Sequence, residues 1–320
     1  MRTVLAIVGP TATGKSALAI EVALRRKGEI INCDSTAVYR GLDIGTDKVP
    51  VAEQRGVPHH LVDVVGADQV YTAAQYARDA EALIRDIHAR GRLPILVGGT
   101  GLYYRALVHG LFPGPGADDA LRMRLDAVAA RRGPERLHRW LQRVDRESAI
   151  RIMPRDQKRL VRALEVYLTT GIPLTQHFAR TVSPIADCTV LTVGLRLPAA
   201  LTSSRVTARV ETQFARGVVA EVEDLLAAGL SPSARSLGGL VYRQIMELRA
   251  GVRDEAETRA LIAQENRRYA RRQLIWFRKE PNLVWLDGPG DRPEVRHEVE
   301  TLLDRVGVAG HGETSNGAGN

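Results

Sequence analysis

Eight consecutive residues near the N-terminus have the types and spacing of a phosphate-binding loop. They match the pattern G-x-x-x-x-G-K-[ST] at every fixed position. They read Gly9, Pro10, Thr11, Ala12, Thr13, Gly14, Lys15 and Ser16. The glycines let successive backbone N–H groups converge on phosphate oxygens. Lys15 would then contact the terminal phosphate, and the Ser16 hydroxyl would ligate Mg²⁺. The sequence therefore predicts a P-loop, which binds a diphosphate as readily as the end of a nucleotide.

Two more polar residues are expected at the same crevice. Residues 29–34 read as a buried strand that ends in Asp34, and residues 93–97 read as a strand followed by Thr100. In a doubly wound sheet, ligands bind at the carboxyl ends of the strands. Asp34 would face the P-loop there, unless it only caps the turn at Ser35. No acidic residue ends the strand at 93–97, which argues against a standard ATPase or GTPase.

The elements that would position these residues follow the order of an α/β protein. A β-branched run at 4–8 precedes the P-loop, and a helix-forming segment at 17–26 follows it. Further strands are expected at 59–65, 189–195 and 282–286, and further helices at 72–90, 201–217, 218–228, 253–277 and 294–306. This order predicts a parallel sheet like that of the P-loop NTPases.

A helical segment interrupts the α/β pattern. A Pro/Gly-rich linker at 112–117 leads into charged helical sequence, and the β pattern returns only at 189. We therefore expect an α/β core at 1–113 and 187–306 with an inserted all-helical domain at 114–186. The tail at 307–320 is rich in Gly, Asn, Ser and Thr and is expected to be disordered.

The charge of the chain favours a polyanionic partner. The net charge is +8 and the pI about 9.8, although arginine-rich composition can also reflect genomic bias. One basic stripe comprises Arg151, Arg155, Lys158, Arg159 and Arg162. A second comprises Arg267, Arg268, Arg271, Arg272, Arg278 and Lys279, interleaved with Tyr269, Trp276 and Phe277. The two stripes beside a P-loop suggest RNA, whereas each stripe alone could be a solvated face, the second over core aromatics.

Two arginines near a sheet strand are candidate phosphate ligands. Arg205 and Arg209 lie one turn apart at the start of the helix that follows the strand at 189–195. A helix in this place can aim arginines at a bound phosphate. Surface salt bridges explain the same spacing equally well.

Composition excludes several other classes of protein. No apolar run has the length of a membrane span, and the first apolar run is too short for a signal peptide. Cys33 and Cys188 are far apart and indicate neither a disulfide framework nor a metal site. We expect a cytoplasmic protein that acts as a monomer.

Several longer motifs resemble the tRNA dimethylallyltransferase family. They are GPTATGKSALA at the P-loop, INCDSTAVYRGLDIGTDK around Asp34, PHHLVDV at 58–64, LVGGTGLYYRAL around Thr100 and QKRLVRALEVYLTTG at 157–171. The resemblance covers the chain to about Leu286. It implies transfer of a dimethylallyl group from dimethylallyl diphosphate to N6 of the adenosine on the 3′ side of the tRNA anticodon (A37), with Mg²⁺ as cofactor.

The resemblance also implies roles for individual residues. Asp34 would take the proton from the adenine amino group, and Thr100 would orient the reacting centre. The P-loop and Arg205 would bind the diphosphate. The anticodon stem-loop would contact Asp34, Ser35, Thr36, Ala37, Thr100, Arg122, Lys158, Arg159, Leu160, Val161 and Arg162. One departure is Val241 before Tyr242, where the family usually has glycine, so the backbone path there is an open question.

Two other functions remain open from the residues alone. A small-molecule kinase also combines a P-loop, a carboxylate after the second strand and a mobile lid. A non-catalytic RNA-binding protein could use the P-loop as a phosphate anchor. Binding of ATP in a base-specific pocket would indicate the kinase, and tight tRNA binding without turnover would indicate the binding protein.

Overall fold

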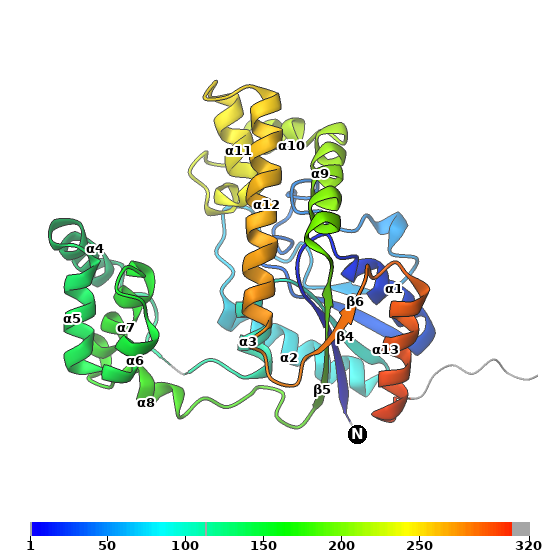
Figure 1. Ribbon diagram of the computed structural model, residues 1–320, viewed down its shortest axis with the longest axis horizontal. Coiled ribbons are helices and arrows are strands. Elements are labelled where there is room, and N and C mark those ends of the chain that lie inside the picture. The colour runs from blue at the N-terminus through cyan, green and yellow to red at the C-terminus, as the bar shows by residue number, and fades with distance from the viewer. Residues whose placement is uncertain (1, 113, 309–320) are drawn as a thin grey trace, which may run out of the picture. The chain divides into compact units, whose positions relative to one another are not determined.

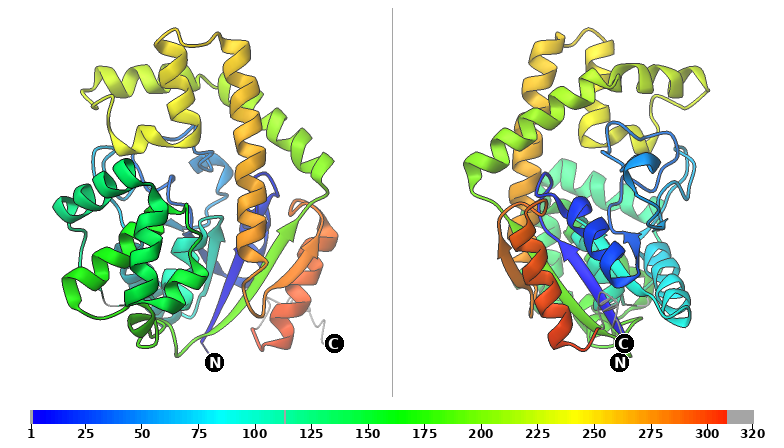
Figure 2. Two further views of the ribbon diagram at one scale, coloured as in Figure 1. Left: turned by 60° about the vertical axis from the view of Figure 1, so that its left-hand side comes forward. Right: turned by 90° about the vertical axis from the view of Figure 1, so that its right-hand side faces the viewer.

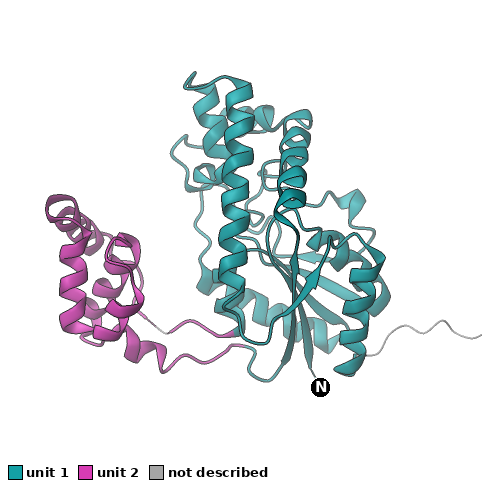
Figure 3. Cartoon of the chain, in the orientation of Figure 1, with its two compact units in different colours: residues 1–108, 185–320 teal, residues 109–184 magenta. Residues whose placement is uncertain are grey.

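The chain divides into two compact units, which Figure 3 shows in different colours. The computed structural model describes residues 2–112 and 114–308. Unit 1 comprises Met1–Val108 and Ile185–Asn320, and unit 2 comprises His109–Pro184. Unit 2 begins five residues before the segment 114–186 expected as an insertion and ends two residues before its end. The tail expected to be disordered lies, from residue 309 on, outside the described residues.

Unit 1 is built on a six-stranded sheet in which all paired strands run parallel (Figures 1 and 2). The strands are β1 (Thr3–Val8), β2 (Gly28–Asn32), β3 (His59–His60), β4 (Leu93–Gly98), β5 (Thr189–Arg196) and β6 (Val284–Asp287). Their order across the sheet is β3-β2-β4-β1-β5-β6. β1 therefore lies between β4 and β5, so the loop that follows it starts at the middle of the carboxyl edge. The α/β class predicted from the sequence is confirmed.

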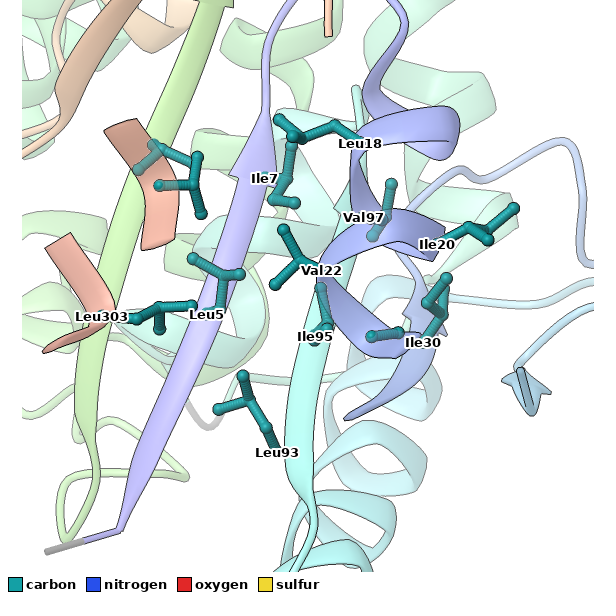
Figure 4. Close-up of a cluster of buried hydrophobic side chains, with 14 of the residues drawn as sticks. Leu5, Ile7, Leu18, Ile20, Val22, Ile30, Leu93, Ile95, Val97 and Leu303 are labelled. Atoms are coloured by element: carbon teal, nitrogen blue, oxygen red, sulfur yellow. The ribbon is translucent and has the colours of Figure 1, made fainter. Parts of the chain in front are cut away.

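The helices of unit 1 cover both faces of this sheet and extend beyond its carboxyl edge. They are α1 (Lys15–Arg26), α2 (Ala73–Ala89), α3 (Gly101–Val108), α9 (Ala199–Ala215), α10 (Val218–Ala227), α11 (Leu240–Arg249), α12 (Glu255–Phe277) and α13 (Pro293–Arg305). α1 and α13 pack on one face, where Leu18 and Leu303 meet Leu5 and Ile7 of β1 (Figure 4). α2 and α3 pack on the other face. Across residues 2–112 and 114–308, none of the helices is long and apolar enough to span a membrane.

A third layer lies beyond the carboxyl ends of the strands, where α9, α10, α11 and α12 extend past the sheet (Figure 1). These helices share a separate apolar cluster that includes Val206, Val222, Tyr242 and Ile262. These helices therefore extend over the carboxyl edge of the sheet, where the P-loop starts.

Two strands end earlier than their sequence pattern predicts. β2 ends at Asn32, whose side chain bonds the backbone N–H and C=O of Asp34 at 3.0 and 2.9 Å. These side-chain bonds replace ladder hydrogen bonds. β3 has only two residues, because Leu61 and Asp63 have φ of 58° and 57°. Such left-handed residues cannot continue an extended strand.

Unit 2 is a bundle of short helices. They are α4 (Asp119–Arg132), α5 (Pro134–Val144), α6 (Arg146–Arg151), α7 (Gln157–Thr170) and α8 (Leu174–Phe178). Leu125, Leu137, Leu141, Leu160 and Leu164 form part of its own apolar core. The aspartates at 118, 145 and 156 accept backbone N–H groups at the starts of α4, α6 and α7.

A buried carboxylate ties α4 to α7. Glu165 is fully buried and accepts Arg122 Nε at 2.9 Å, Arg122 Nη2 at 3.0 Å and Arg162 Nη1 at 2.7 Å. Burial alone would raise the pKa of Glu165, but the hydrogen bonds from the two arginines lower it below its ordinary value. Arg122 and Arg162 therefore stabilise the fold of unit 2, whatever else they bind.

This pair gives a prediction about stability. Arg122→Ala should lower the free energy of unfolding by about 1 to 3 kcal/mol, because it removes two charge-assisted hydrogen bonds from a carboxylate that stays buried. The contribution of the pair should be present above the ordinary glutamate pKa and disappear as the pH falls through the lowered pKa of folded Glu165. Calorimetric melts at several pH values measure both effects. Lys158→Ala on the same unit is the control, and an equal loss in that variant would contradict the assignment.

Candidate active site

A pocket of about 450 Å³ opens at the carboxyl edge of the sheet in unit 1. Its walls come from the P-loop, the segment after β2, the loop at 45–49 and helices α9, α11 and α12. All of its lining residues belong to unit 1. The polar and charged side chains that line the pocket include Lys15, Ser16, Asp34, Asp47, Arg209, Tyr269 and Gln273.

The backbone of the P-loop is held in place from two neighbouring segments. Gly9 has φ of 127°, and a Cβ there would lie 2.7 Å from the carbonyl oxygen of Leu195 on β5. The N–H of Gly290 donates to the Thr13 carbonyl at 2.8 Å. Pro10 and Thr13 are buried behind the loop, with the Thr13 hydroxyl donating to the Pro10 carbonyl at 2.9 Å. The positive end of α1, which starts at Lys15, therefore faces the pocket.

The ammonium group of Lys15 is held against the backbone of the P-loop. Its Nζ donates to the Pro10 carbonyl at 2.5 Å. Burial, with the nearby Arg209 guanidinium, lowers the pKa of Lys15 to about 7, while the charge of Asp34 acts in the opposite direction. An anion bound at the loop would favour the charged ammonium.

Asp34 reaches the pocket two residues after β2 ends. Its Oδ1 accepts the Thr36 N–H at 2.9 Å and the Thr36 hydroxyl at 2.7 Å. Within the described residues, no hydrogen bond engages Oδ2. Asp34 thus combines the two possibilities considered from the sequence, since one oxygen closes a turn and the other stays available in the pocket.

Thr100 lies directly behind this turn rather than in the pocket wall. Its Oγ1 accepts the Ser35 N–H at 3.0 Å, and its own N–H donates to the Cys33 carbonyl at 3.1 Å. The preceding Gly98 explains the missing acidic residue, because a Cβ there would lie 2.2 Å from the Cys33 carbonyl oxygen. The chain after β2 occupies the space that a side chain at this strand end would need.

The two candidate arginines of α9 have different surroundings. Arg209 Nη1 donates to Thr11 Oγ1 at 2.6 Å and pairs with Asp47 Oδ2 at 3.1 Å, so it lies in the pocket. Arg205 pairs with Asp291 at 3.2 Å and is absent from the described pocket lining. Arg209 therefore contacts a P-loop side chain directly, whereas Arg205 pairs with Asp291, whose backbone lies beside Gly14 of the P-loop. Their spacing of one turn could not distinguish them.

Three further residues of the pocket, Asp47, Tyr269 and Gln273, were not predicted as site residues from the sequence. Burial raises the pKa of Asp47 to about 6, although Arg209 counteracts it. Burial, then the charge of Asp34, raises the pKa of Tyr269 to about 12, so its hydroxyl stays protonated. Gln273 accepts the Thr11 N–H and donates to the Gly99 carbonyl, both at 2.9 Å. The spacing of four between Tyr269 and Gln273 on α12 was the available signal.

The residue that departs from the family pattern causes no irregularity. Val241 is buried in the apolar cluster of the α9–α12 layer. α11 begins at Leu240 after an extended Gly239, so residue 241 has ordinary helical backbone that needs no glycine. Tyr242 donates to Glu221 Oε1 at 2.7 Å. The same carboxylate accepts the backbone N–H groups at 43, 44 and 45, which orders the loop that carries Asp47.

The residues expected to contact tRNA fall into two groups. Ser35, Thr36 and Ala37 follow Asp34 and line the pocket of unit 1. In unit 2, Lys158 and Arg159 are exposed on α7, but Leu160 and Val161 are buried in the apolar core. The side chains of Leu160 and Val161 therefore do not reach the surface of unit 2.

The second basic stripe, on α12, carries aromatic side chains that belong to the core. Phe277 is fully buried, and Trp276 packs edge-on against it with ring centroids 4.8 Å apart. A Cβ at Gly101 would lie 2.4 Å from the Trp276 ring. Trp276 and Phe277 are therefore core aromatics beneath a solvated face, the alternative to stacking on RNA bases.

The fold and the pocket define the class of the molecule. A P-loop follows the central strand of a parallel sheet, and a lysine, an arginine and a helix N-terminus converge on it. This is a P-loop protein whose candidate site lies at the carboxyl edge of the sheet, the place where such folds bind phosphate groups.

Comparison with known proteins narrows the class to a family. A model of the IPP transferase family matches residues 37–280. The tRNA dimethylallyltransferase of Solibacter usitatus is 46% identical over 305 residues, which cover 94% of this chain and 97% of that protein. The chain belongs to the IPP transferase family, and the family resemblance seen in the sequence is confirmed.

Two solved structures agree with this assignment. The full-length tRNA isopentenylpyrophosphate transferase of Bacillus halodurans superposes with a TM-score of 0.70 at 34% identity, covering 95% of this chain and 96% of that one. A eukaryotic dimethylallyltransferase acting on tRNA has a TM-score of 0.76 at 25% identity, covering 94% of this chain and 78% of that one. The fold is therefore shared along nearly the whole chain.

The lowered pKa of Lys15 gives a prediction about proton uptake. At pH 8 most Lys15 should be neutral, because its pKa is about 7. Pyrophosphate bound at the P-loop should raise this pKa, so binding should take up about one proton per site at pH 8 and less near pH 6. Titration calorimetry in buffers of different ionisation enthalpy measures the uptake. The Lys15→Met variant corrects for proton exchange by pyrophosphate itself, and equal uptake in both proteins would contradict the prediction.

Proposed function

We propose that this chain transfers a dimethylallyl group from dimethylallyl diphosphate to N6 of the adenosine on the 3′ side of the tRNA anticodon, A37. The observation that carries the proposal is the pocket that combines a phosphate-binding P-loop with the carboxylate of Asp34 in a member of this family. In the reaction, N6 attacks the carbon bonded to the diphosphate oxygen. The C–O bond breaks, diphosphate leaves, and N6 loses one proton.

The P-loop side of the pocket supports the departure of diphosphate. The backbone N–H groups of the loop, the start of α1 and Lys15 would hold the two phosphates. Arg209, which already contacts Thr11, would stabilise charge on the leaving oxygen. We place Arg209 in this role ahead of Arg205, because Arg205 pairs with Asp291 outside the pocket.

The residues present fit a magnesium ion that is bound largely by the substrate. Ser16 is exposed at the start of α1 and lines the pocket. Within the described residues, no group of three histidine, cysteine or acidic side chains could hold a metal. Mg²⁺ commonly keeps several waters and takes one or two protein ligands with phosphate oxygens. The Ser16 hydroxyl would hold it, and the ion would neutralise charge on the diphosphate.

Asp34 and Thr100 would act on the adenine. Asp34 Oδ2 would accept the N6 proton while Oδ1 keeps its bonds to Thr36. Thr100 would fix the Ser35 turn and so the orientation of Asp34, in addition to any direct contact with the substrate. The target base must leave its stack to reach this pocket, which costs least in a single-stranded loop.

The RNA contacts would extend from the pocket to unit 2. Ser35, Thr36 and Ala37 would contact the target nucleotide, and Lys158 and Arg159 would contact phosphates of the anticodon stem-loop. Arg122 and Arg162 already bond Glu165, so they would add to RNA binding only the positive charge that Glu165 does not neutralise. We expect the protein to act on tRNA in the cytoplasm as a monomer.

Incubation with tRNA tests the proposed reaction. With dimethylallyl diphosphate and Mg²⁺, nucleoside mass analysis should find adenosine that has gained one C₅H₈ unit. An anticodon stem-loop with guanosine at position 37 is the matched control and should stay unmodified. ATP in place of the prenyl diphosphate should yield no modified nucleoside. Phosphate transfer from ATP without any prenylation would contradict the proposal and favour a kinase.

The two functions of Asp34 can be separated in one variant. Asp34→Asn keeps an oxygen for the Thr36 hydrogen bonds but cannot take up the proton. Single-turnover transfer at saturating tRNA and dimethylallyl diphosphate should slow by roughly 10² to 10⁴, while the thermal midpoint and tRNA affinity stay near those of the wild type. A stable variant with the wild-type single-turnover rate would show that Asp34 only caps the turn.

A further inference from the structure

A groove in unit 2 between α4 and α5 gathers positive charge that the sequence patterns did not single out. It has a volume of about 740 Å³. Its lining includes Arg124, Arg131, Arg132, Arg136, Arg139 and Arg143, together with Trp140. Trp140 is 36% exposed. No acidic residue is among the lining residues of this groove in the described part of the chain.

Two acidic residues of the same two helices have hydrogen-bond partners outside the groove lining. Asp126 of α4 accepts Gln157 Nε2 at 2.6 Å, and Glu135 of α5 accepts Arg155 Nε at 3.1 Å. Within the described residues, no ion pair joins any of the six groove arginines to a carboxylate. Because arginine stays charged at all working pH values, the groove carries positive charge that no ion pair neutralises, although the charge of Glu135 acts on Arg139 at longer range.

Helix dipoles explain only part of this arrangement. Arg131 and Arg132 lie in the last turn of α4, and Arg143 lies in the last turn of α5, where cations are favourable. Arg136, in contrast, lies in the first turn of α5, which begins at Pro134. A cation is unfavourable at that end of a helix. The groove therefore concentrates like charges at a cost to folding, which a bound polyanion would offset.

The basic stripe from Arg151 to Arg162, which begins at the end of α6 and continues on α7, differs in this respect. Arg151 pairs with Glu147 at 2.8 Å, Arg155 with Glu135 at 3.1 Å and Arg159 with Asp156 at 3.3 Å. Among the charged residues of this stripe, Lys158 alone has no carboxylate partner in the described ion pairs. Much of the charge of this stripe is thus neutralised within unit 2, whereas the six arginines of the α4–α5 groove have no ion pair in the described residues.

We propose that the α4–α5 groove binds the sugar-phosphate backbone of RNA, as a contact for tRNA additional to the pocket and α7, with Trp140 packed against a ribose or base. The proposal rests on the proposed function in taking tRNA as the partner. Guanidinium groups bind phosphate oxygens in pairs of parallel hydrogen bonds, and indole rings stack on nucleotides. Arg136, Arg139 and Arg143 follow one helical face at spacings of three and four, which gives a continuous row of donors.

Salt-dependent binding of full-length tRNA tests the groove. The triple variant Arg131→Gln, Arg136→Gln, Arg139→Gln keeps helix propensity and removes three charges. Its affinity at moderate salt should fall at least tenfold, and the slope of log K against log salt should decrease by about 2. The control triple variant is Arg25→Gln, Arg85→Gln, Arg305→Gln, which removes equal charge from exposed positions of unit 1. It should change the slope by less than half as much.

The fluorescence of Trp140 reports whether RNA reaches the groove itself. tRNA should quench part of the tryptophan emission of the wild type, and that part should be missing in Trp140→Phe. Equal quenching in both proteins, or a groove variant that binds tRNA like its control, would overturn the proposal. So would displacement of tRNA by poly-glutamate at equal charge concentration, or tighter binding to phosphatidylglycerol vesicles than to tRNA, each of which indicates another partner.

Prenyl transfer separates failure of this proposal from failure of the proposed function. The groove variant should raise the KM for tRNA but leave kcat at saturating tRNA within about twofold, since none of its residues lines the pocket. Normal transfer with an unchanged KM in the groove variant would contradict RNA binding by the groove but not the proposed reaction. A wild-type protein that binds tRNA through the groove without prenyl transfer would contradict the proposed reaction but not RNA binding by the groove.

Discussion

The interaction on which the active site depends is the convergence of positive charge at one largely buried place. The N-terminus of α1, Lys15 and Arg209 all face the same part of the pocket. Asp34 and Asp47 balance this charge only in part, and the pKa of Lys15 falls to about 7 as a result of burial and its cationic neighbour. A site in this state gains more from a multivalent anion than from a neutral ligand. Diphosphate meets that requirement.

Close backbone contacts hold the charged groups in register. Gly9 lies against Leu195, and Gly98 lies against Cys33, at distances that exclude a Cβ. Gln273 joins the P-loop to the chain after β4 through bonds to Thr11 and Gly99. The P-loop, the Asp34 turn and the Thr100 segment are therefore mechanically linked. Because residue 98, at the end of β4, is glycine instead of the acidic residue usual there, the chain that leads into the Asp34 turn can occupy this space.

Local patterns in the sequence carried the fold and part of the site. Strand composition, the P-loop motif and helix caps depend on neighbouring residues, so the parallel sheet and the positions of Lys15 and Asp34 could be predicted. Arg209 could not be separated from Arg205, because both lie on one face of α9 and only the position of Asp291 divides them. Gln273 was missed for a similar reason, since its partners are 174 and 262 residues away.

The same limit applies to charge. A sequence shows how many arginines a helix has, but pairing depends on which carboxylates the tertiary fold brings near them. Arg122 and Arg162 look like ligands for RNA until Glu165 is found buried between them. Arg136 and Arg139 lie beside Glu135 in the sequence, but in the fold Glu135 forms its ion pair with Arg155 and acts on Arg139 only at longer range. A surface arginine without a carboxylate partner is therefore a better guide to a polyanion site than the density of basic residues along the chain.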